Sequence, residues 1–62
     1  MKEAKLILTL RSSEGLPATD RQDLAELFAI HAEVVAEMLS QGFVEGQLTD
    51  EGFDGWWKIE AE

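Results

Sequence analysis

The sequence of 62 residues contains no cysteine, and it has five basic residues against thirteen acidic ones. Without cysteine, neither a disulfide framework nor a thiolate zinc site is possible. The formal net charge of -8 argues against direct binding to nucleic acid or to an anionic membrane. The apolar run Leu6-Ile7-Leu8, like the others in the sequence, is far too short to cross a bilayer, and we expect no signal peptide before it. We therefore expect a cytoplasmic protein.

What is present is the composition of a chain that folds, with 45% hydrophobic and 29% charged residues. The length leaves room for one domain, spanning residues 1–62. A domain of about 60 residues buries only about 60% of the surface that its unfolded chain exposes, so small domains usually need a supplement. With disulfides excluded, oligomerisation is the supplement we expect, although repulsion between chains of charge -8 opposes it.

The first half of the chain predicts a strand and then a helix. Alternating apolar residues predict the strand over Ala4–Arg11. A helical pattern then begins at Thr19, which forms a capping-box signature with Gln22, and it continues to Gln41. Gly42 supplies the left-handed conformation that ends a helix.

The second half predicts a hairpin. Its strands are expected over Phe43–Thr49 and Phe53–Glu60, joined by a loop over 50–52. Gly46 and Gly55 lie inside these strands and mark either a bulge or an aromatic ring over bare backbone. We therefore predict an α+β fold of order β-α-β-β, with a three-stranded, mainly antiparallel sheet and one long amphipathic helix across one face. A right-handed crossover puts the last strand, which carries both tryptophans, in the centre of the sheet.

The predicted helix has one apolar side and one side stripe of small residues. The apolar arc comprises Leu24, Leu27, Phe28, His31, Val34, Val35, Met38 and Leu39. The stripe comprises Ala25, Ala29, Ala32 and Ala36. These alanines reflect either helix propensity alone or a close contact with the helix of a second copy.

His31 lies in the middle of the apolar arc, where a charge would be costly. It could act as a metal ligand, a general base or a pH switch. The alternative that we favour is a neutral core histidine whose nitrogens are hydrogen-bonded. It is the only histidine, and the helix glutamates face away from it, so a zinc site lacks further ligands.

Two adjacent tryptophans, Trp56 and Trp57, lie in the last predicted strand. Because adjacent strand residues point to opposite faces, the two indoles cannot enter the same core. We expect Trp56 on the face that one helix cannot cover, and Trp57 beneath the helix with three leucines, Leu6, Leu8 and Leu10.

The uncovered face is the candidate interaction surface, because an exposed tryptophan beside aliphatic side chains is typical of binding sites. Its expected members are Trp56, Ile7, Lys58 and either Phe43 or Val44. In the alternative interpretation, the ring lies over its own strand neighbours and is screened by the stems of Lys5 and Lys58.

The acidic residues admit two interpretations. A row of glutamates on the helix, Glu26, Glu33 and Glu37, could mimic a nucleic-acid backbone and occupy a basic groove on a partner protein. The alternative is a solvated surface that keeps a small protein soluble. Around the hairpin, Asp50, Glu51 and Asp54 suggest calcium only weakly, because EF-hand spacing is absent.

Catalytic motifs are absent from the sequence. Ser12 and Ser13 have no strand-turn-helix elbow around them, and there is no glycine-rich phosphate loop. We expect a protein that is not an enzyme and that needs neither a cofactor nor a metal.

The segments QGFVEG (41–46) and GWWKIE (55–60) resemble the ends of small bacterial and phage proteins in which a helix leads into a glycine-aromatic hairpin closed by a tryptophan strand. The resemblance implies no catalytic activity. It implies a phage or mobile-element origin, where small acidic proteins include inhibitors of host defence such as anti-CRISPR proteins.

Together these features predict a non-enzymatic module that binds another protein, as a small acidic phage-type inhibitor would in the host cytoplasm. The alternatives are a structural homo-oligomer and a nucleic-acid mimic. We also expect a homodimer through the uncovered face, with Trp56 and Ile7 at its centre, because burying two indoles at a two-fold axis removes much apolar area from water.

Overall fold

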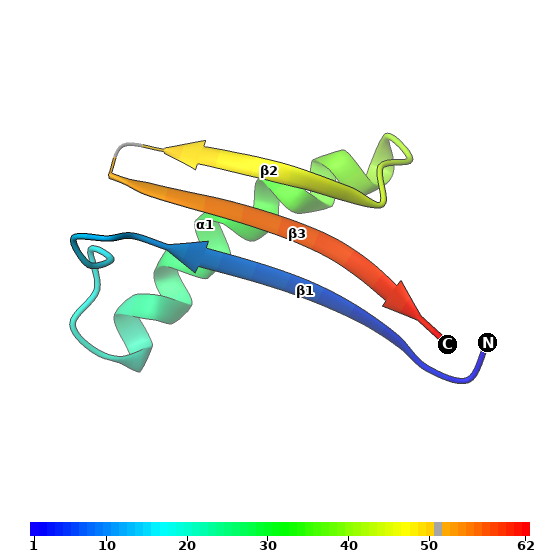
Figure 1. Ribbon diagram of the computed structural model, residues 1–62, viewed down its shortest axis with the longest axis horizontal. Coiled ribbons are helices and arrows are strands. Elements are labelled where there is room, and N and C mark those ends of the chain that lie inside the picture. The colour runs from blue at the N-terminus through cyan, green and yellow to red at the C-terminus, as the bar shows by residue number, and fades with distance from the viewer. Residues whose placement is uncertain (51) are drawn as a thin grey trace.

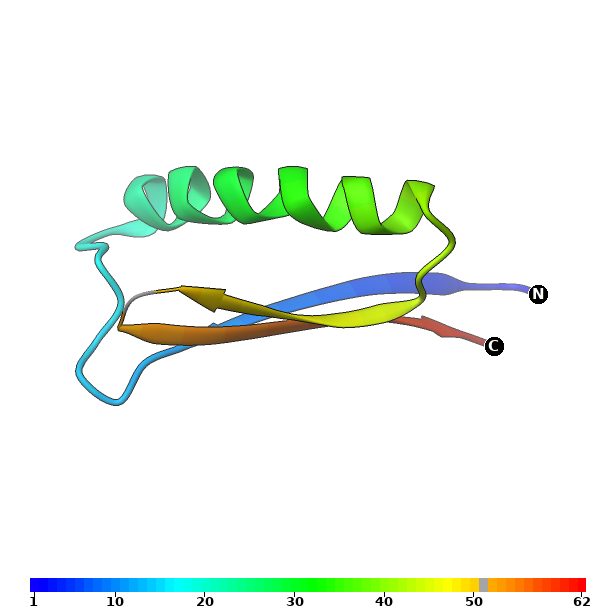
Figure 2. The same ribbon diagram turned by 90° about the horizontal axis from the view of Figure 1, so that it is seen from above.

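The computed structural model describes residues 1–50 and 52–62, and over these residues it contains three strands and one helix. They follow in the order β1 (Ala4–Arg11), α1 (Arg21–Ser40), β2 (Glu45–Asp50) and β3 (Phe53–Ala61). The strands form an antiparallel sheet of order β1-β3-β2, and α1 lies across one face (Figures 1 and 2). The predicted α+β class, strand order and central tryptophan strand are confirmed. Glu51, expected in the hairpin loop and among the hairpin acids, lies outside the described residues.

The end of α1 explains why β2 starts later than predicted. Gly42 has a φ of +94°, and its amide donates to the Leu39 carbonyl at 3.0 Å. The amide of Phe43 donates to the Met38 carbonyl at 3.2 Å, which completes a Schellman cap. This cap uses the Phe43 amide, so the predicted strand start at Phe43 is wrong, and β2 begins at Glu45.

The start of α1 differs from the prediction by one residue. Asp20, not Thr19, is the N-cap, and its carboxylate accepts a hydrogen bond from the Asp23 amide at 2.9 Å. Thr19 instead donates to the Asp23 carboxylate from its hydroxyl at 2.7 Å and from its amide at 3.1 Å. These bonds fasten the loop to the first helical turn. The helix is therefore capped by Asp20, one residue later than predicted.

The core lies between α1 and the centre of the sheet. Trp57 and Val35 are only 1% and 2% exposed, and Leu48 is buried beside them. The indole Nε1 of Trp57 donates to Met38 Sδ at 3.2 Å. A Cβ added at Gly46 would come within 2.7 Å of that Nε1, so the ring lies against bare backbone, one of the two predicted roles for this glycine.

The helix does not cover its face of the sheet evenly, because it crosses the strands diagonally (Figure 1). Leu6 and Ile59 are paired on this face and are 54% and 41% exposed. The expectation that Leu6 packs beneath the helix with Trp57 is therefore wrong. Val34, expected in the buried arc of α1, is 43% exposed on a flank of the helix.

Candidate functional site

The face of the sheet that points away from α1, called here the open face, carries the candidate site. Strand alternation and register place Trp56 near its centre, on β3, between Thr9 of β1 and Gln47 of β2. Trp56 is 38% exposed, whereas its neighbour Trp57 is buried. The side chains that the strands present on this face are Lys5, Ile7, Thr9, Arg11, Glu45, Gln47, Thr49, Asp54, Trp56, Lys58 and Glu60.

Arg11 is the residue of this face that sequence reasoning missed. Its guanidinium carbon lies 5.7 Å from the centroid of the Trp56 ring, within cation–π range. The two are diagonal neighbours, because Thr9 pairs with Trp56 and Arg11 with Asp54. Alternation alone places Arg11 on the correct face, but the contact depends on the register between β1 and β3. Tryptophan and arginine are the side chains most enriched at binding hot spots.

The charge of the open face differs from that of the whole molecule. The face holds three basic side chains and three acidic ones, so its formal charge is zero. The net charge of -8 therefore resides entirely on the rest of the protein. A partner can approach this face without meeting the electrostatic barrier that the remaining surface presents to an acidic protein.

Lys58 is held on the open face by its neighbours on either side. Its Nζ lies 2.9 Å from Glu60 Oε1. The hydrogen bond that Lys58 donates to Glu60, together with the negative charges of Glu60 and Glu45, raises the pKa of Lys58 above its usual value. The lysine thus stays protonated at neutral pH and offers its remaining donors to a partner.

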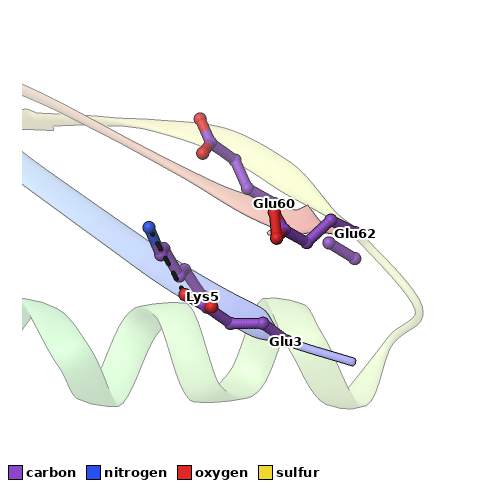
Figure 3. A pocket seen from close by; sticks show the side chains of 5 residues that line it. Glu3, Lys5, Glu60 and Glu62 are labelled. Atoms are coloured by element: carbon purple, nitrogen blue, oxygen red, sulfur yellow. Dashed lines mark ion pairs between the residues drawn. The ribbon is translucent and has the colours of Figure 1, made fainter. Parts of the chain in front are cut away.

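At the terminal end of the sheet, a shallow hollow of about 90 Å³ is lined mainly by charged side chains (Figure 3). Lys5 and Glu3, both from the β1 end of the chain, form an ion pair at 3.5 Å beside Glu60. Ligand pockets are usually several hundred Å³ and largely apolar. This hollow therefore does not have the character of a small-molecule site.

The predicted companions of Trp56 are only partly brought together. Ile7 lies on the open face and is half-buried, one row away from Trp56 opposite Lys58. Phe43 and Val44, 53% and 62% exposed, precede β2 and are not among its strand residues. Val44 accepts a hydrogen bond from the Ile59 amide, and alternation then aligns it with the helix side of the sheet. Gln47, not Phe43 or Val44, is the β2 residue opposite Trp56.

The helix glutamates lie on a separate surface. Glu26, Glu33 and Glu37 are exposed, on the side of α1 opposite to the buried His31 and Val35. Because α1 covers the face of the sheet away from Trp56, the structure places these glutamates and the tryptophan on opposite sides of the molecule (Figure 2). One partner surface of ordinary flatness cannot contact both.

His31 is buried at 7% exposure and faces the sheet. Its Nδ1 lies 2.9 Å from the Leu27 carbonyl, which can only accept, so Nδ1 carries a proton. Its Nε2 lies 3.5 Å from Asp50 Oδ2, an ion pair when the ring is protonated. The ring also meets Phe53 edge-on, with centroids 5.3 Å apart. These contacts describe a histidine held within the core.

Over residues 1–50 and 52–62, no group of three or more His, Asp or Glu side chains is arranged to hold a metal ion. In the same part of the chain, no helix combines the length and apolar character needed to cross a membrane. Asp50 and Asp54, two of the three hairpin acids, belong to different strands and lie on opposite faces of the sheet.

Comparisons with protein-family models, with curated proteins and with solved structures found no match for this chain. The open face therefore has to be interpreted from its own chemistry.

Proposed function

We propose that the protein is a non-enzymatic binding module that recognises another protein through the open face, with Trp56 and Arg11 as its anchor. The observation that carries the proposal is the exposed indole at the centre of the sheet, stacked against a guanidinium on a face of zero net charge. The edge and uncovered surface of the Trp56 indole offer apolar contact, while Arg11, Gln47 and Lys58 supply polar contacts around the ring.

Energetic considerations support this assignment. A tryptophan that passes from full exposure to full burial removes about 150–250 Å² from water. Because Trp56 is 38% exposed, a partner that covers it completely buries roughly 60–95 Å² more, which contributes about 1.5–2.4 kcal/mol at about 25 cal/mol per Å². Its contact with Arg11 also limits the conformational freedom that binding would otherwise remove from both side chains. A rigid sheet presents the pair with little rearrangement on binding.

The proposal is tested by affinity capture from bacterial lysate with immobilised native protein and with Trp56→Ala. A specific partner should be retained by the native chain and reduced at least about thirtyfold by the substitution, the effect of losing a hot-spot residue. In Trp56→Ala the buried Trp57 becomes the only indole, so its fluorescence reports whether the variant is folded. Retention that is unchanged by Trp56→Ala and by Arg11→Ala would overturn the proposal.

A matched control lies on the opposite surface. Glu33→Gln and Glu37→Gln leave the open face intact and should leave capture unchanged. If capture instead depends on these glutamates, the helix surface is the binding site and the nucleic-acid mimic is the correct function.

The phage-type inhibitor predicted from the sequence adds that binding blocks the activity of the partner. Once a partner is captured, the native chain should inhibit its activity in stoichiometric amounts, and Trp56→Ala should require a much higher concentration.

A further inference from the structure

The chain exposes more surface than its mass accounts for. Its accessible surface is 4984 Å², whereas a compact monomer of 6.9 kDa exposes about 4,000 Å². Its radius of gyration is 12.6 Å, against about 10.6 Å for a compact chain of this length. The excess of about 1,000 Å² is close to the roughly 800 Å² that one partner contributes to a standard protein interface.

Incompletely buried apolar side chains lie at two places that are related by the diagonal course of α1. In Figure 1 the first turns of α1 extend past β1, on the side away from β3, and Leu24 and Phe28 in these turns are only half-buried. At the opposite end of β1, the helix leaves a corner of the sheet uncovered, where Leu6 and Ile59 are exposed. The molecule thus has an apolar overhang and an apolar gap at opposite ends of one strand.

That strand, β1, is also a free edge of the sheet. The Ile59 amide points toward β2, where it donates to the Val44 carbonyl. Because the backbone groups of successive strand residues point to alternate sides, the amides and carbonyls of the residues on either side of Ile59 point toward β1. The same alternation directs the amides and carbonyls of Leu6, Leu8 and Leu10 outward, away from β3. The strand contains no proline and no charge that points toward the helix, two of the features that prevent edge pairing, and its charged side chains, Lys5 and Arg11, both lie on the open face.

We propose that a second copy of this chain pairs with the free edge of β1, antiparallel, about a two-fold axis normal to the sheet. Antiparallel pairing places the C-terminal end of one β1 beside the N-terminal end of the other. The overhanging turns of each helix are then carried over the exposed Leu6 and Ile59 of the other copy. Both copies fill the gap of their partner with the same residues, as a two-fold interface requires.

An axis at Ile7 pairs the strand along its length, with Leu6 opposite Leu8 and Ala4 opposite Leu10 of the other copy. Lys5 then lies opposite Thr9, so the lysine and Arg11 of the two copies do not face one another. The result is a six-stranded sheet with both helices on one side and both open faces on the other.

Other places for a second copy are less favourable. Pairing two β2 edges would bring Glu45 and Asp50 of both copies together. Stacking two open faces, as the sequence suggested, would put six charged side chains of each copy into the interface. The edge of β1 avoids both costs and leaves Trp56 free for the proposed partner, so this inference does not depend on the proposed function.

The test is sedimentation equilibrium over a concentration series, with three variants beside the native chain. The native protein should approach twice its 6.9 kDa mass. Leu6→Lys should raise the dimer dissociation constant at least about tenfold, even though it lowers the net negative charge. Ile30→Lys makes the same charge change at a site 63% exposed, on the side of α1 opposite to Phe28, and Trp56→Ser changes the open face; both should leave the dimer intact.

Amide hydrogen exchange supplies a second readout that needs no variant. At concentrations that favour the dimer, the amides of Leu6, Leu8 and Leu10 should become protected, because they face the second copy. A native chain that stays monomeric up to the high micromolar range would overturn the proposal. So would a dimer that is lost in Trp56→Ser or Ile30→Lys but kept in Leu6→Lys, or one that leaves these amides unprotected.

Discussion

Gly46 is one of two positions, with Gly55, where the backbone of the sheet lies closest to core side chains. A side chain there would place its Cβ 2.7 Å from Trp57 Nε1 and 3.2 Å from Met38 Sδ. The methionine can adjust, but the indole is 1% exposed and has no space to move into. The absence of a side chain at this position thus determines how deeply Trp57 can sit beneath α1.

We therefore expect Gly46→Ala to lower the free energy of unfolding by about 1–3 kcal/mol through overpacking, as measured by urea denaturation. Gln47→Ala, at the next and exposed position of β2, is the control and should change stability by less than about 0.5 kcal/mol. Equal stability of the two variants would mean that the indole moves aside freely.

Asp23 links the loop before α1 to the helix. The hydroxyl and amide of Thr19 donate to its carboxylate, and these bonds hold the pKa of Asp23 below its usual value of 3.8. A folded-state pKa below the unfolded value means that the bonds stabilise the fold above about pH 3.8, and that this contribution is lost as the pH falls through the folded pKa.

Thr19→Ala should consequently move the pKa of Asp23 up toward 3.8, because the hydroxyl bond makes the largest contribution to the shift. Carboxyl carbon NMR titration measures this directly. Thr49→Ala, an exposed threonine on β2, should leave the titration of Asp23 unchanged. The stability difference between Thr19→Ala and the native chain should shrink as the pH falls below the folded pKa.

At the scale of the elements, α1 is stabilised by packing more than by its own charges. Its first turn carries Asp23, which suits the positive end of the helix dipole, but its last turn carries no basic residue. Glu33 and Glu37 are also one turn apart and repel one another.

Glu37→Lys should therefore stabilise the protein by about 0.5–1 kcal/mol. It replaces a repulsion with a Glu-to-Lys pair in the favourable direction and puts a cation near the C-terminus of the helix. Glu26→Lys makes the same change in net charge in the second turn of α1, far from the C-terminal end of the helix dipole. If thermal denaturation shows equal gains for both variants, net charge alone is responsible.

The elements also show where sequence reasoning succeeds. Alternation in Ala4–Arg11 and around Trp57 reflects burial on one face of a sheet, so those strands and the assignment of the two indoles to opposite faces were predictable. Phe43 has the same β propensity as a strand residue, but its amide is used by the helix cap. Thr19 and Asp20 are both good caps, and the sequence alone does not choose between them.

What alternation cannot provide is how elements lie against one another. The Arg11 contact with Trp56 depends on the register between β1 and β3, which is a property of two strands far apart in the chain. The exposure of Leu6 depends on the crossing angle of α1, which side-chain periodicity does not specify. These two features carry the proposed binding surface and the proposed dimer edge.

At the scale of the whole molecule, repulsion within the net negative charge opposes the compact fold. The chain is small and elongated, with principal extents of 37, 21 and 19 Å, and all of its net charge of -8 lies outside the open face. At about 0.01 M salt the Debye length is about 30 Å, so most of these charges repel one another across the molecule. At about 0.15 M it is about 8 Å, less than the thinnest dimension of the protein, and only neighbouring charges still interact.

Raising the salt over this range should therefore raise the melting temperature by several degrees, since about 1 kcal/mol corresponds to 4–8 °C for a domain near this size. Screening also weakens the exposed pairs Lys58–Glu60 and Lys5–Glu3, but exposed pairs of this kind add little to stability. This measurement is made on the Leu6→Lys variant. Salt also favours the proposed dimer, and this substitution should keep the chain monomeric. Glu37→Lys added to it should reduce the salt dependence. A melting temperature that falls with salt would show instead that local ion pairs outweigh the net repulsion.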